Sequence, residues 1–196
     1  MEDSMTVSDG GYKLQVFRDE DAQSPREWDN LGKMVCWHRR YNLGDKHEYE
    51  DPQAFMESDE YKNAFVILPL FLYDHSGITM SNTDFGDRFD SGQVGYIFVT
   101  KEQAQNEYHC ELDEKLADRI REMLIAETKM YDQYLQGDCY AFKIMDGQGE
   151  EVDACSGFFG DELKEVLSEM RESCNDEFGG LFEKMEKHSS AYAAMM

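Results

Sequence analysis

The stretch "NAFVILPLFLYD", residues 63–74, decides the fold because it is the most apolar part of the chain. A continuous apolar run of this length is typical of a central strand that is covered on both faces of a sheet. Pro69 interrupts the run, and proline has no N–H to donate to a ladder of strand hydrogen bonds. The stretch therefore predicts a central strand with either a bulge near Pro69 or a second half that lies at a sheet edge.

Shorter patterns on either side predict further strands. Residues 93–100, "QVGYIFVT", form the second strong strand pattern, and residues 12–20 alternate apolar and polar side chains. Residues 34–40 predict a short strand or an irregular segment. Towards the C-terminus, residues 138–159 predict a hairpin around the Asp-Gly turn at 146–147.

Helix signals lie between and after these strands. Thr100 and Gln103 form a T-x-x-Q capping box, which marks the start of a helix. Residues 111–135 repeat apolar side chains at three- and four-residue steps, and Gly137 ends this helix. Further helices are predicted from Pro52, over residues 160–174 and around residues 178–185.

Together these patterns predict an α+β fold: a mixed, mainly antiparallel sheet with helices packed on one face and an acidic helical C-terminal segment. The chain has no βαβ series and no Gly-rich phosphate loop to support a doubly wound fold. The predicted organisation is a flexible N-terminus over residues 1–11, a core domain over 12–160, acidic helices over 161–188 packed on that core, and a flexible tail over 189–196.

The charge of the chain limits its partners. Its 196 residues include 42 Asp and Glu against 19 Lys and Arg, for a net charge of −23. Binding to a nucleic-acid backbone requires cations that neutralise phosphates, so direct binding of DNA or RNA is not expected. The surface favours basic partners, including the basic groove of a nucleic-acid-binding protein. The alternative, that the acidic surface serves solubility alone, stays open at this stage.

The cysteines and the N-terminus indicate the cellular setting. Five widely spaced cysteines without a C-x-x-C pair form neither a disulfide framework nor a zinc site. The first residues, "MEDSMTVSDGG", lack the basic and apolar parts of a signal peptide. The longest apolar run is far too short to span a membrane. We therefore expect a cytoplasmic protein, in the cytoplasm of the host cell if a phage encodes the chain, and no membrane partner.

One basic segment, residues 32–50, differs from its acidic surroundings. Guanidinium and imidazole groups suit phosphate or carboxylate ligands. The anion-binding candidates are His38, Arg39, Arg40 and His47. Two alternatives stay open: a thiolate nucleophile at Cys36 beside His38, or a structural role in which the arginines act as internal counter-charges and stack on Trp37.

A second candidate site follows the central strand. Hard oxygen ligands with one imidazole could bind a divalent metal ion. The metal-ligand candidates are Asp74, His75, Asp84, Asp87 and Asp90. Their spacing does not match an EF-hand, and the alternative is that these side chains cap turns through local hydrogen bonds. No cofactor is predicted beyond such a metal ion.

The C-terminal part concentrates negative charge. Residues 146–186 contain thirteen Asp and Glu against three Lys and Arg. Carboxylates in rows on helices can resemble the spacing of phosphates in duplex DNA, although an ordinary solvated helix face gives the same pattern. The partner-binding candidates are Glu162, Glu165, Glu169, Glu172, Asp176 and Glu177.

Four motifs carry a resemblance to a known group of proteins: "EWDNLGKMVCWHRRYNLGD", "LPLFLYDHSGITMS", "DSGQVGYIFVT" and "YDQYLQGDCYAF". Taken together they resemble a family of small uncharacterised proteins encoded by bacteriophages and other mobile elements of gut-type bacteria. The likeness covers roughly residues 12–159. It implies no catalytic residue. It does imply a context in which small acidic accessory proteins bind a host protein, often one that handles nucleic acid or takes part in defence.

These observations leave two functions. The first is an acidic accessory protein of a phage or mobile element that binds a basic surface of a host or phage protein. Such a protein could be a counter-defence inhibitor that mimics the charge of nucleic acid. The second is a small metal-dependent hydrolase or an anion-binding protein with a His/Arg/Asp pocket. The sequence contains no recognised catalytic signature, which favours the first function, and it leaves open whether the chain forms a homodimer.

Overall fold

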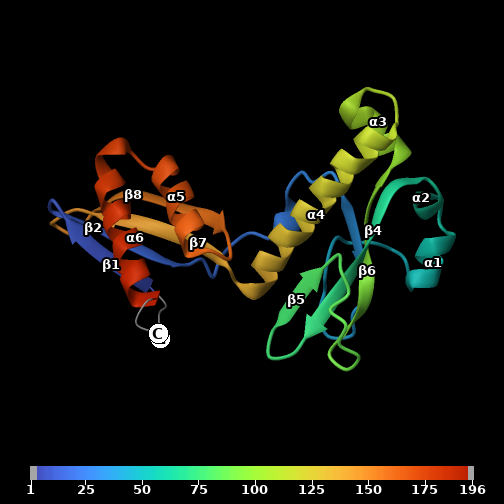
Figure 1. The fold of residues 1–196 in the computed structure, drawn as a ribbon, viewed down its shortest axis with the longest axis horizontal. Coiled ribbons are helices and arrows are strands. Elements are labelled where there is room, and N and C mark those ends of the chain that lie inside the picture. The colour runs from blue at the N-terminus through green and yellow to red at the C-terminus, as the bar shows by residue number, and fades with distance from the viewer. Residues whose placement is uncertain (1–3, 194–196) are drawn as a thin grey trace. The chain divides into compact units, whose positions relative to one another are not determined.

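The computed structural model describes residues 4–193 and divides the chain into two compact units (Figure 1). Unit 1 combines residues 1–23 with residues 137–196, and unit 2 contains residues 24–136. The predicted α+β class is confirmed, and every strand pairing among the described residues is antiparallel. The strands form two sheets, whereas the sequence predicted one sheet in a core domain over residues 12–160. No helix in the described part is long and apolar enough to cross a membrane.

Unit 1 is a four-stranded sheet with two helices on one face (Figure 1). The strand order is β1-β2-β7-β8. Its elements are β1 (Ser4–Asp9), β2 (Tyr12–Arg18), β7 (Cys139–Met145), β8 (Glu151–Phe159), α5 (Leu163–Ser173), a 3-10 turn (Asp176–Phe178) and α6 (Gly179–Ala193). The core between sheet and helices includes Leu14, Phe142, Leu167 and Phe182, all fully buried. The acidic C-terminal helices are therefore held by a buried apolar face.

Both ends of unit 1 contain more regular structure than the sequence predicted. Residues 1–11 were expected to be flexible, but β1 pairs with β2 along its whole length. Gly10 and Gly11 both have positive φ angles, which a two-residue hairpin turn of this kind requires. At the other end, α6 extends through residues 189–193 of the predicted flexible tail, and residues 194–196 lie outside the described part.

Unit 2 contains the second four-stranded sheet, with the order β3-β6-β4-β5 (Figure 1). Its elements are a 3-10 turn (Pro25–Glu27), β3 (Lys33–Cys36), α1 (Pro52–Glu57), α2 (Asp59–Lys62), β4 (Ala64–Asp74), β5 (Ile78–Ser81), β6 (Ser91–Thr100), α3 (Lys101–Tyr108) and α4 (Glu114–Gln136). The predicted capping box at Thr100 and Gln103 is confirmed at the start of α3.

The central strand of unit 2 is covered on both faces, as its apolar run predicted. On one face Ile120 and Leu124 of α4 pack in a cluster with Leu70 of β4. On the other face Ile67 of β4 packs against Phe55 of α1 and Phe98 of β6. The conflict at Pro69 is resolved by a register shift next to it, between Leu70 and Phe71, and by the short neighbour β5. Because β5 pairs only with residues 71–74, Pro69 has no strand on that side to which it would have to donate a hydrogen bond.

Close packing of β6 against β3 gives a stability prediction. A Cβ atom at Gly95 would lie 2.1 Å from the backbone oxygen of Val35, whereas a Cβ atom at Gly92 in the same strand would meet no atom within 4 Å. We expect Gly95→Ala to destabilise unit 2 by about 1–3 kcal/mol, since the backbone of β3 would have to move. Gly92→Ala should change stability by less than about 1 kcal/mol. Urea unfolding followed by tryptophan fluorescence measures both effects, and equal stabilities of the two variants would contradict the close approach.

Candidate functional site

The basic segment forms a loop that folds back onto β3. Gly44 forms an isolated bridge with Val35, and the N–H of Asp45 donates to the carbonyl of Met34 over 2.8 Å. The N–H of Gly44 also donates to the hydroxyl of Tyr131 in α4, over 3.0 Å. Gly44 has a φ of +70°, and a Cβ atom there would lie 2.8 Å from the Met34 oxygen. Only glycine therefore fits this position easily, and it fixes the return path of the loop.

Arg26 connects this loop to helix α4. Its guanidinium donates to both carboxylate oxygens of Asp45 over 2.8 Å and to Glu127 of α4 over 3.0 Å. The Arg26 side chain is only 5% exposed, and its two partners are 22% and 15% exposed. Burial alone would lower the pKa of Arg26, but Asp45 and Glu127 raise it. Arg26 is therefore a buried internal counter-charge. Of the two arginines for which the sequence suggested this role, Arg40 pairs with Asp74, and Arg39 makes no ion pair among the described residues.

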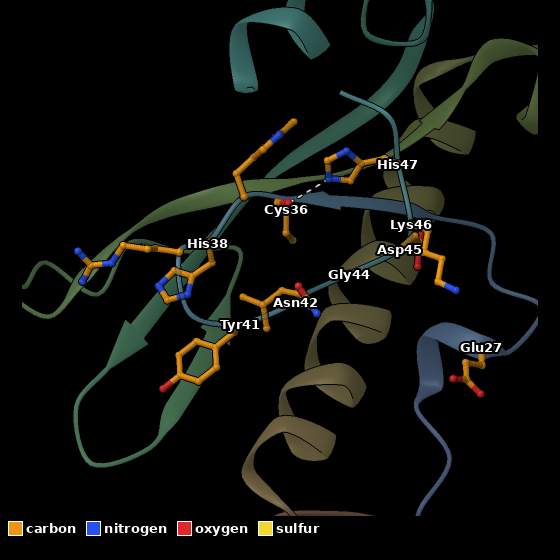
Figure 2. A pocket seen from close by; sticks show the side chains of 12 residues that line it. Glu27, Cys36, His38, Tyr41, Asn42, Gly44, Asp45, Lys46 and His47 are labelled. Atoms are coloured by element: carbon orange, nitrogen blue, oxygen red, sulfur yellow. Dashed lines mark hydrogen bonds between the residues drawn. The ribbon is translucent and has the colours of Figure 1, made fainter. Parts of the chain in front are cut away.

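A pocket of about 810 Å³ lies under the loop (Figure 2). Three of the four anion-binding candidates line it, namely His38, Arg39 and His47, together with Lys46. The fourth candidate, Arg40, lines a neighbouring depression of about 310 Å³, to which His38 and Arg39 also contribute. The structure thus brings the predicted basic residues together, divided between two adjoining hollows.

His47 is fixed by a backbone contact and by aromatic rings. Its Nε2 atom lies 3.0 Å from the carbonyl oxygen of Cys36 (Figure 2), and since a carbonyl can only accept, this nitrogen carries the proton. The Nδ1 atom is buried and has no hydrogen-bond partner among the described residues. Trp37 packs edge-on against His47 with ring centroids 5.0 Å apart. The suggested stacking of Trp37 on an arginine is not seen, and Arg40 lies over Tyr41 instead.

His38 is held as a neutral ring. Its Nδ1 atom accepts the backbone N–H of Arg40 over 3.3 Å, and its Nε2 atom lies 4.0 Å from a carboxylate oxygen of Asp74. Desolvation, followed by the charges of Arg40 and Arg39, lowers the pKa of His38 below its ordinary value. Asp74 does not reverse this shift, because its carboxylate is already paired with the guanidinium of Arg40. His38 therefore offers an N–H donor rather than a positive charge near neutral pH.

Removing Arg40 is expected to raise the pKa of His38. Arg40→Gln removes a repulsive charge and frees Asp74 to stabilise the protonated ring, and both changes act in the same direction. In the wild-type protein, the lowered pKa means that the unfolded state binds this proton more readily than the folded state, so stability falls as the pH drops from the ordinary histidine pKa towards the lowered one. An NMR titration of the histidine ring signals measures the pKa. Arg39→Gln is the control and should raise the pKa less, and an unchanged or lower value in Arg40→Gln would contradict this geometry.

The thiol of Cys36 is not suited to nucleophilic chemistry. Burial, followed by the charge of Asp45, raises the pKa of Cys36 to about 12. The contact with His47 goes to the Cys36 carbonyl and not to the sulfur. A thiolate nucleophile requires a lowered pKa. The alternative of a Cys–His nucleophile is therefore not supported.

The metal-ligand candidates do not gather around one point. Asp74 pairs with Arg40, and His75 pairs with Asp90 over 3.0 Å. Asp84 and Asp87 each accept the backbone N–H two residues ahead, over 2.9 and 2.8 Å. No group of three or more His, Cys, Asp or Glu in residues 4–193 is arranged to hold a metal ion. The local hydrogen bonds match the alternative in which these aspartates cap turns.

The acidic candidates of α5 form a row on its exposed face. Glu162 precedes the helix, and Glu165, Glu169 and Glu172 follow at steps of three, four and three residues, all exposed. The opposite face carries buried residues such as Leu167. The remaining two candidates, Asp176 and Glu177, are exposed just beyond the helix. Within the described part of the chain, none of the six candidates makes an ion pair.

Residues important to the pocket were partly missed at the sequence level. Lys46 belongs to the basic segment but was not among the anion-binding candidates, and no role was predicted for Arg26. Proximity to the basic cluster could have identified Lys46. No local pattern identifies Arg26, because its partners lie 19 and 101 residues away in the sequence.

The chain has no significant match among protein-family models, curated proteins or solved structures. The resemblance to phage-encoded proteins therefore rests on the four sequence motifs.

Proposed function

We propose that this chain is a non-enzymatic binding protein that docks the carboxylate row of α5 onto a basic surface of another protein. The row consists of Glu162, Glu165, Glu169 and Glu172. The observation that supports the proposal is that these carboxylates are exposed on one helix face and make no ion pair among the described residues. Carboxylates at such spacing repel one another by a few tenths of a kcal/mol per pair, so a cationic partner relieves repulsion as well as adding attraction.

The spacing of the row suits a mimic of nucleic-acid charge. Glu172 lies ten residues after Glu162 in the chain. At the rise of an α-helix this corresponds to a length of about 15 Å. Four charges over this length give about one charge per 4–5 Å, close to the interval of about 3.4 Å along one strand of B-DNA. A basic groove that follows a phosphate backbone could therefore accept α5. With the resemblance to phage proteins, this spacing supports a counter-defence inhibitor that occupies the nucleic-acid site of a host or phage protein.

Affinity purification from cells that naturally carry the chain tests the proposal. We expect capture of a protein with a basic surface that is retained at about 50 mM salt and released by about 500 mM, since exposed charges are screened over shorter distances at high salt. The matched bait is the variant Glu165→Gln/Glu169→Gln/Glu172→Gln, which should fail to retain the same protein. Retention that is insensitive to salt and equal for both baits would contradict the proposal.

The alternative of a metal-dependent hydrolase has weaker support. Its five proposed ligands are engaged in separate local contacts, and no ligand set gathers in residues 4–193. The other form of the alternative, an anion-binding protein, is supported by the pocket that His38, Arg39 and His47 line.

A further inference from the structure

The pocket lined by the basic loop contains two cations that make no ion pair among the described residues. Arg39 and Lys46 both line it and are exposed, and neither makes an ion pair with any residue of the described part. The neighbouring carboxylates are already engaged: Asp45 is held by Arg26, and Asp74 is paired with Arg40. In a chain with a net charge of −23, two cations without an ion pair at one pocket are a local exception, and Glu27 is the carboxylate of the lining that opposes them.

The polar groups of the pocket are spread along it. In Figure 2, His38 and Tyr41 lie at one end and Lys46 lies at the other, with Asn42 and Gly44 between them. Arg39 adjoins His38 in the chain. Two cations and an exposed amide in one pocket suit a ligand with two negative charges, since guanidinium and ammonium groups bind oxyanions by charge-assisted hydrogen bonds.

The walls of the pocket suit the organic part of such a ligand. The Tyr41 ring stacks on His38 with centroids 5.0 Å apart, which leaves flat, uncharged surface beside Arg39. The lowered pKa of His38 keeps this ring neutral and able to donate one N–H. The volume of about 810 Å³ lies within the range of roughly 300–1,000 Å³ that is usual for small-molecule sites.

The loop that carries these groups is fixed before any ligand arrives. Asp45 is held by Arg26, Gly44 by the hydroxyl of Tyr131, and His47 by the Cys36 carbonyl. A fixed loop loses less conformational entropy on binding, which favours affinity for a small ligand.

We propose that this pocket is a binding site for a small organic anion that carries two negative charges, such as a phosphate ester or a dicarboxylate. Arg39 and Lys46 bind the two charged ends, and Asn42 donates a hydrogen bond between them. Glu27 also lines the pocket and lies on the Lys46 side in Figure 2, where it weakens anion binding. The site lies in unit 2 and does not depend on the proposed function of α5 in unit 1.

A titration followed by ¹H–¹⁵N NMR at constant ionic strength tests this proposal, with pyrophosphate and succinate as probes. We expect saturable shifts confined to residues 36–47 with at least one probe. Arg39→Gln and Lys46→Gln should each weaken that binding about tenfold, as expected for loss of one charge-assisted hydrogen bond. Glu27→Gln should strengthen the binding of that probe. Lys164→Gln, at an exposed position of α5, should leave the binding unchanged.

The two probes also distinguish whether the site binds phosphate or carboxylate groups. Binding of pyrophosphate alone identifies a phosphate site, and binding of succinate alone identifies a carboxylate site. Binding of neither probe at about 20 mM, well above the roughly millimolar affinity of a weak specific site, would overturn the proposal. Shifts spread over cations elsewhere in the chain, or equal affinities for all the variants, would overturn it as well.

Discussion

Arg26→Met is expected to destabilise unit 2 by about 3–5 kcal/mol, because it leaves two partly buried carboxylates without their cation. Arg26 holds Asp45 and Glu127 together, and it also donates to the carbonyl of Gly32 over 2.6 Å. Its side chain is almost fully buried, so water cannot replace these contacts. Urea unfolding measures the loss, and tryptophan fluorescence reports on unit 2 alone because both tryptophans, Trp28 and Trp37, lie within it.

An exposed ion pair in the same unit provides the control. Arg121 pairs with Asp118 one turn away on α4, with both side chains largely exposed. Arg121→Met should therefore change the free energy of unfolding by less than about 1 kcal/mol. A similar loss for both variants would show that the buried network does not anchor the basic loop.

Neutralising the α5 row is expected to weaken partner binding by about tenfold to hundredfold at low salt. The variant Glu165→Gln/Glu169→Gln/Glu172→Gln removes three exposed charges, each of which contributes up to about 1 kcal/mol to a surface ion pair. The stability of unit 1 should change by less than about 1 kcal/mol, since the buried face of α5 is untouched and the repulsion within the row is relieved. Calorimetry with the captured partner measures the affinity.

The matched control removes the same charge from unit 2. Glu107, Glu111 and Glu122 are exposed and make no ion pair among the described residues. Their combined change to glutamine should weaken binding by less than about threefold, as expected for exposed charges that do not contact the partner and are screened by salt. Equal losses for the two triple variants would mean that net charge, rather than the α5 row, determines binding.

Local patterns in the sequence predicted most of the fold. The apolar run over residues 63–74 indicated β4, the capping box at Thr100 indicated α3, and Gly137 marked the end of α4. Each of these signals depends on residues within one or two turns of a helix or within one strand. Hydrophobic periodicity and end-capping hydrogen bonds are local properties, so a single sequence is enough to read them.

The sequence was less informative where partners are distant or segments are short. Residues 4–9 alternate too weakly to indicate β1 by themselves, and the strand is stabilised by pairing with β2 through the Gly10–Gly11 turn. The four-residue strand β5 lies in a segment for which the sequence predicted no strand, and it depends on pairing with β4. The division into two units could not be read either, because unit 1 joins residues from both ends of the chain.

The candidate sites also could be predicted where their residues are close in sequence, and could not where the structural contacts decide. His38, Arg39 and His47 are close in sequence, so their shared pocket could be predicted from the cluster alone. The row on α5 followed from helical spacing. The metal-ligand candidates were proposed from their chemistry and their proximity in sequence. In the structure Asp84 and Asp87 accept backbone N–H groups of their own turns, Asp74 pairs with Arg40, and Asp90 pairs with His75.

The most direct measurement of the role of α5 is an NMR titration of the whole chain with a short peptide of arginine and lysine residues. We expect the largest shifts at Glu165, Glu169 and Glu172, and their disappearance between about 50 and 500 mM salt. Shifts of equal size over the acidic residues of both units, or shifts that persist at high salt, would contradict the claim that this helix face selects positively charged partners.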